Sequence, residues 1–329
     1  MGYSKWNNNA YQSRQTHRKQ TNQSAFTYDQ HVRSSGVIQV HDDMNPYGKV
    51  RESRDSVDHP TSLSIGVLFD VTGSMGTVPR VLQTKLGSLM RLLIQKGYVE
   101  HPQVLFGAIG DAYTDRVPLQ IGQFESGIEM DDDLGKIFLE GNGGGQVHET
   151  YELGMYFMAH NTSIDCYEKR GKKGYLFTIG DEKPYKVVRK DHIQQHIGGA
   201  VEQDVPIQQV VEAVQEKYEY FHIIPANTYH GKKSEVQNVW RDLLGERVLL
   251  LEDETAVCET IALAIGLCEG VVDDLYDGVT DLVDAGYDAN SAQTASSALK
   301  TYAKNRQPVL SMGKGRLAAT AVSDDDGRL

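Results

Sequence analysis

Apolar runs alternate with segments of helical periodicity over most of this chain, and this alternation constrains the fold more than any other feature. Residues 62–70 form a continuous apolar run, as expected for a central parallel strand that is covered on both faces. Thr77 and Pro79 then suit the start of a helix. The following leucines recur at helical spacing and predict one buried stripe: Leu82, Leu86, Leu89 and Leu93.

The same strand, loop and helix order recurs along the chain. Further buried strands are expected at Val104–Asp111, Gly174–Asp181, Tyr220–Ala226 and Arg247–Glu252. Helices are expected at Ile128–Leu139, around Leu153–Phe157, and at Arg189–Ile197, Ile207–Tyr218, Val236–Leu244 and Thr255–Cys268. Pro118–Phe124 alternates in polarity and is typical of a half-exposed, antiparallel edge strand. We therefore predict a doubly wound α/β fold with a mainly parallel sheet and one antiparallel edge strand.

The composition divides the chain into three parts. Residues 1–60 are rich in Asn, Gln and Ser and form a polar N-terminal arm, for which composition indicates a disordered tail. The alternative is an arm held against its own domain or a neighbouring molecule. Residues 61–270 carry the α/β pattern, and residues 271–329 read as an acidic, helical C-terminal extension with a loose end.

Charge and cysteine content exclude several classes of protein. A net charge of −12 argues against nucleic-acid binding, which needs lysine and arginine clustered on one face. The three cysteines lack CxxC spacing, so neither a disulfide framework nor a zinc ribbon is expected. No apolar run reaches the length of a membrane span, and the N-terminus lacks the apolar segment of a secretory signal. These observations predict a cytoplasmic protein without membrane contact.

Small oxygen-bearing side chains gather where the predicted strands end. The first strand runs into FDVTGSMG, which supplies Asp70, Thr72 and Ser74, and a later strand ends at Asp181. Helix capping alone explains one of these residues but not all of them. Because the carboxyl ends of neighbouring parallel strands lie about 5 Å apart, we expect the loops to converge on one ion. Thr72 and Ser74 then offer neutral ligands, with Asp70 and Asp181 holding coordinated waters, as suits Mg²⁺.

This pattern of loops resembles the von Willebrand factor A domain, most closely its intracellular branch with the motif DxTGSM. The resemblance covers roughly residues 63–270 and rests on DVTGSM at Asp70 and on GDEKP at Asp181. It implies a metal-ion-dependent adhesion site that binds Mg²⁺, or Mn²⁺ or Ca²⁺, with Gln146 in place of the family's threonine. The implied metal residues are Asp70, Thr72, Ser74, Gln146 and Asp181. The residues expected around them, in a second shell or at the rim, are Gly73, Asp111, Gly145 and Thr150.

The resemblance implies a binding module and not an enzyme. In this reading the ion completes its coordination with an Asp or Glu of a partner protein, such as an AAA-type ATPase or a subunit of a larger assembly. One alternative is a structural subunit with a degenerate metal site. Another is a metal-dependent phosphohydrolase, but Thr72 stands where the phosphatase pattern DxDxT/V needs its second aspartate.

Overall fold

A six-stranded sheet forms the centre of the molecule. The computed structural model describes residues 2–75, 77–141 and 147–306. Along the sheet the strands are β12 (Val248–Leu251), β11 (Tyr218–Pro225), β7 (Gly174–Ile179), β2 (Leu63–Asp70), β3 (Pro102–Ile109) and β4 (Leu119–Ile121). All neighbouring pairs are parallel except β3 and β4, so the antiparallel strand lies at the edge as predicted.

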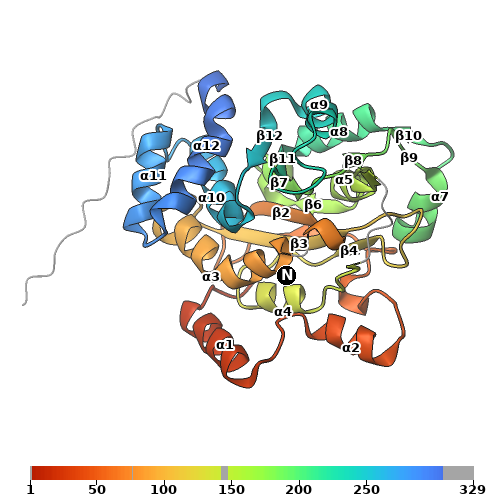
Figure 1. Ribbon diagram of the computed structural model, residues 1–329, viewed down its shortest axis with the longest axis horizontal. Coiled ribbons are helices and arrows are strands. Elements are labelled where there is room, and N and C mark those ends of the chain that lie inside the picture. Colours follow the sequence, from red (N-terminus) through yellow and green to blue (C-terminus); the bar gives the residue numbers. More distant parts are fainter. Residues whose placement is uncertain (1, 76, 142–146, 307–329) are drawn as a thin grey trace, which may run out of the picture.

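Helices cover both faces of this sheet, which explains the unbroken apolar runs. Every residue of β2, β3 and β7 is buried. Figure 1 shows α3 (Val78–Gln95) and α10 (Val257–Glu269) on one side, and α5 (Tyr151–His160) and α8 (Ile207–Lys217) on the other. The predicted leucine stripe of α3 is fully buried. The mixed α/β fold with a mostly parallel central sheet is thus confirmed.

The remaining helices and strands are mostly short and connect the main layers. The helices are α4 (Glu129–Gly135), α6 (Asp165–Glu168), α7 (Lys190–His192), α9 (Ser234–Leu244), α11 (Leu275–Asp284) and α12 (Ala289–Asn305). Single turns are η1 (Asp42–Met44), η2 (Gly73–Met75), η4 (Gly245–Arg247) and η5 (Glu254–Ala256), and η3 (Ile193–Ile197) is a π-helix. Three two-stranded pairs were not predicted: β1 (Arg51–Ser53) with β6 (Thr162–Ile164), β5 (His148–Glu149) with β8 (Lys183–Pro184), and β9 (Val187–Val188) with β10 (Val205–Pro206).

The N-terminal arm is ordered, which corrects the prediction of a disordered tail. It forms α1 (Asn8–Thr21) and α2 (Thr27–Ser35), which pack near α3 and α4. Tyr11 is buried, and its ring lies where a side chain at Gly87 of α3 would stand. Its hydroxyl donates to the backbone carbonyls of Gln83 and Thr84. A few buried apolar residues, such as Tyr11, Phe26 and Met44, suffice to hold the arm, so its mean polarity misled the composition argument.

The C-terminal extension is helical, as predicted. α12 packs against α10 and β12, and α11 packs against α12. The predicted loose end, residues 307–329, lies outside the described residues. No helix in the part of the chain that the structure describes is both long enough and apolar enough to cross a bilayer.

Candidate metal centre at the sheet edge

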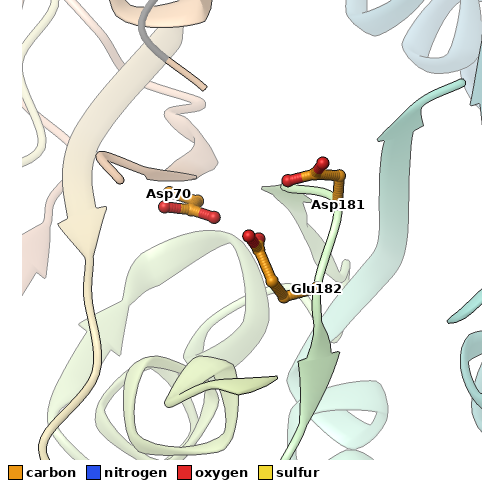
Figure 2. Close-up of side chains that lie close together, drawn as sticks. All are labelled: Asp70, Asp181 and Glu182. Carbon is orange, nitrogen blue, oxygen red and sulfur yellow. The ribbon is translucent and has the colours of Figure 1, made fainter. Parts of the chain in front are cut away.

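Three buried carboxylates meet where β2 and β7 end. Asp70 is the last residue of β2, and Asp181 and Glu182 follow β7. Each offers an oxygen within 4.8 Å of the others, and each is at most 4% exposed. Figure 2 shows the Glu182 side chain pointing toward Asp70, with the Asp181 carboxylate turned toward the same space. We call these three residues the acidic cluster.

Strand order explains why these residues meet. β2 lies between β3 and β7, so the chain leaves β2 toward one edge and later returns to its other side. Loops that leave two such neighbouring strands diverge and leave a crevice at their carboxyl ends, where open α/β sheets bind ligands. Asp70 and Asp181 stand at this point, as the sequence predicted.

Local hydrogen bonds fix Asp70. The backbone N–H of Thr72 donates to its Oδ1 over 2.7 Å, and the Tyr151 hydroxyl donates to its Oδ2 over 3.2 Å. The Tyr151 hydroxyl reaches this place because residue 180 is glycine, since a Cβ there would lie 1.8 Å from the Tyr151 oxygen. Gly180, the glycine of the sequence GDEKP, therefore leaves room for the Tyr151 hydroxyl beside Asp70.

Hydrogen bonds from the loop after β11 and from α9 hold the segment that carries Asp181 and Glu182. The backbone N–H of His230, in the loop after β11, donates to Asp181 Oδ2 over 3.3 Å. The indole N–H of Trp240 in α9 donates to the Glu182 backbone carbonyl over 2.9 Å. Tyr151 packs edge-on against both His222 and Trp240, which stack on each other. Buried rings thus surround the Tyr151 side chain that reaches Asp70.

Burial and mutual repulsion disfavour ionisation of these acids. Burial raises the pKa of Asp70, and the charge of Asp181 adds to the rise, whereas the hydrogen bonds from Glu182 and Thr72 oppose it. Burial, and then the Asp70 charge, raises the pKa of Glu182 far above its ordinary value. In the absence of a cation, Glu182 therefore holds a proton at neutral pH.

A fourth carboxyl group, that of Glu149, lies beside this cluster. Pairing of β5 with β8 places Glu149 opposite Pro184, two residues beyond Glu182. Glu149 is 5% exposed, and its Oε2 has no hydrogen-bond partner among the described residues. Burial and the Asp70 charge raise its pKa strongly. Sequence reasoning missed Glu182 and Glu149 as site residues; the only signal for Glu182 was its place directly after Asp181.

The remaining predicted site residues lie around the cluster or outside the described chain. Thr72 is buried and borders Asp70, and Gly73 begins the turn η2. Asp111 accepts hydrogen bonds from the Tyr113 N–H and the Thr114 and Tyr185 hydroxyls. The Thr150 hydroxyl donates to the Gly110 carbonyl. Asp111 and Thr150 are thus buried and bond to the end of β3 and the turn that follows it. The Ser74 side chain, Gly145 and Gln146 fall outside what the structure describes.

The chemistry of this donor set suits a divalent cation. Carboxylate and hydroxyl oxygens are the ligands of Mg²⁺, Mn²⁺ and Ca²⁺. Like charges this close are costly in a buried site, and a bound cation would offset that cost. Asp70, Asp181 and Glu182 would hold such an ion, with Thr72 beside them.

Comparisons with known proteins give only distant likenesses. No family model and no curated protein matches this chain. Its structure is similar to the pilus adhesin SpaC from Lactobacillus rhamnosus GG in the open conformation, with a TM-score of 0.44 and 10% identity over 69% of this chain and 32% of the adhesin. It is also similar to proximal thread matrix protein 1 from the mussel byssus, with a TM-score of 0.38 and 10% identity over 69% of this chain and 51% of that protein. The chain thus matches about a third of one protein and half of the other, and likenesses of this size identify no family.

Proposed function

We propose that this protein is a binding module in which a divalent cation at the acidic cluster bridges to an Asp or Glu of a partner protein. The observation that carries the proposal is the convergence of Asp70, Asp181 and Glu182, from loops far apart in sequence, within 4.8 Å at the carboxyl edge of the sheet. Helix caps and turns do not account for this arrangement, because only one carboxylate is needed to cap a helix.

The order of the strands supports a von Willebrand factor A domain. If the six strands of the sheet are numbered along the chain, their order across it is 6-5-4-1-2-3, with strand 3 antiparallel. In the resemblance, the motif DxTGS follows strand 1 and the later aspartate follows strand 4, which are the positions of Asp70 and Asp181. We therefore assign the sheet to this doubly wound arrangement and the cluster to its adhesion site.

The charge of the cluster suits an ion that accepts an outside ligand. Asp70 and Asp181 offer the two negative charges that balance one divalent cation. The Thr72 hydroxyl adds a neutral oxygen, which leaves the ion electrophilic. An acidic side chain of a partner is the ligand that such an ion favours.

Ion binding is the first test. Mg²⁺ at a hundredfold excess over its dissociation constant should stabilise the protein by about 2.7 kcal/mol, seen as a shift of the urea unfolding midpoint. The shift should vanish in Asp181→Asn and persist in Asp277→Asn, which removes an exposed carboxylate of α11 far from the cluster. Equal shifts in wild type and Asp181→Asn would rule out an ion at this place.

Partner capture is the second test. Pull-downs from native lysate should recover a partner with Mg²⁺ that is lost with chelator and with Asp70→Ala. If the same proteins appear in all three conditions, the metal-bridged mode is wrong. Turnover of phosphorylated small molecules with Mg²⁺ or Mn²⁺ that is lost in Asp70→Ala would favour the phosphohydrolase instead.

A further inference from the structure

A pocket of about 280 Å³ opens beside the loop that follows β2, and the N-terminal arm forms one of its walls. Thr72 and Gly73 line it from the loop after β2, and Arg80 lines it from the first turn of α3. Asp29 and Arg33, both in α2, close it from the arm. Its volume lies just under the range of about 300–1,000 Å³ that is usual for drug-sized ligands, so it suits one or two side chains.

Positive charge is available in this pocket. Arg80 is exposed and forms no hydrogen bond or ion pair with any described residue. Arg33 is half exposed, with its Nε bonded to Asp29 and its Nη2 to the Leu139 carbonyl. Asp29 therefore offsets the charge of Arg33, and the charge of Arg80 is left without a counter-charge. The pocket also lies at the N-terminus of α3, an 18-residue helix whose dipole favours an anion there.

One residue connects the pocket to the acidic cluster. Thr72 lines the pocket, and its backbone N–H holds Asp70 over 2.7 Å. Anything seated in the pocket thus lies beside the loop that carries the proposed ion. The two places favour the same kind of ligand, because a divalent cation and an unpaired guanidinium both bind carboxylates.

We infer that the pocket receives a second acidic side chain of the same partner, held by Arg80 and Arg33 while its neighbour binds the ion. The inference rests on the proposed function and makes the partner surface a short acidic peptide segment with two nearby carboxylates. It gives α2 of the N-terminal arm a role in recognition. A nucleic acid is a poorer candidate, since the chain carries a net charge of −12.

The test uses a fluorescein-labelled tetra-aspartate peptide, with tetra-asparagine as the uncharged control, and measures fluorescence anisotropy with Mg²⁺ and with EDTA. Arg80→Gln should weaken tetra-aspartate binding about tenfold, as the loss of one charge-assisted bond implies. Arg33→Gln should weaken it less, because Asp29 already offsets that charge. The matched control is Lys19→Gln/Lys300→Gln, which removes two exposed cations of α1 and α12 and should leave affinity within twofold.

The outcomes separate this inference from the proposed function. Binding that requires Mg²⁺ but is equal in wild type and Arg80→Gln would overturn the pocket and leave the ion bridge standing. Binding that is lost in Arg80→Gln but indifferent to EDTA would keep the pocket and refute the bridge. Competition by 1 mM inorganic phosphate as strong as by the peptide itself would show an anion site without peptide specificity, and would overturn the assignment to an acidic segment. Because Arg80 bonds to no described residue, its replacement should not impair folding, which a thermal melt checks.

Discussion

Two regions of this molecule bury aspartates in opposite ways. In the acidic cluster, Asp70 lies with Asp181 and Glu182, so three carboxyl groups are buried together. In the second region, which we call the arm clamp, Asp131 of α4 is fully buried but accepts bonds from Arg18 over 2.7 Å and Arg14 over 3.2 Å. Gln83 of α3 donates to the same carboxylate over 3.0 Å.

The difference appears in the pKa values. Burial by itself would raise the pKa of Asp131, but the bonds from Arg18, Gln83 and Arg14 lower it overall. Burial raises the pKa of Asp70 and Glu182, and the charges of neighbouring carboxylates add to the rise. A buried carboxylate with its cations in place serves the fold, whereas carboxyl groups that are buried together are costly to ionise. Such perturbed groups in a crevice are typical of functional sites.

The largest effect should come from breaking the arm clamp. Asp131→Asn leaves two arginines without their buried partner and should lower the free energy of unfolding by about 2–3 kcal/mol, somewhat below a fully buried pair because Arg14 and Arg18 are partly exposed. Urea unfolding measures the loss, and faster hydrogen exchange in α1 would locate it.

The matched control for the clamp is Asp132→Asn. Asp132 binds Arg14 over 2.6 Å but is half exposed, so its loss should cost less than about 1 kcal/mol. Equal losses at positions 131 and 132 would contradict the distinction between a buried clamp and an ordinary surface pair.

A change in the acidic cluster should act in the opposite direction. Glu182→Gln keeps the shape of the side chain and removes a carboxyl group that burial and the Asp70 charge hold protonated. We expect the metal-free protein to gain about 1 kcal/mol in free energy of unfolding and to lose its stabilisation by Mg²⁺. Urea unfolding with EDTA and with Mg²⁺ measures both. A loss of stability in EDTA would show that the cluster serves the fold.

The smallest effect is a difference in pH dependence between the two regions. The pKa of Asp131 is lower in the folded state, so its contribution is present above its unfolded pKa of about 4 and is lost as pH falls below that value. The pKa of Glu182 is higher in the folded state, so metal-free stability falls as pH rises above about 4.3.

Unfolding at a series of pH values in EDTA measures both slopes. The gap between wild type and Asp131→Asn should close below pH 4, and the gain from Glu182→Gln should grow from pH 4.5 to pH 8. A gain that is constant over this range would mean that residue 182 keeps an ordinary pKa.

Most of the α/β core could be predicted because its signals are local. The structure has the apolar run that ends at Asp70 and the leucine stripe from Leu82 to Leu93, both as predicted. Each of these patterns lies within a single strand or helix, so it can be recognised without knowing the fold. The short strands could not be predicted in this way, since two-residue pairs such as β5 with β8 carry no periodicity. The helices of the arm were missed because their burial rests on few anchors, among them Tyr11 and Phe26.

The main strands and helices of the α/β core, and the small oxygen-bearing residues at the strand ends, follow from local sequence, because these depend on neighbours a few positions apart. Only the tertiary structure decided which carboxylates share a space. It brought Glu182 to Asp70 and placed Glu149 beside them, because strand order and chain reversals fix distances between residues remote in sequence. The same packing placed two arginines on Asp131 and two further carboxyl groups beside Asp70, a difference that the identity of the residue alone does not reveal.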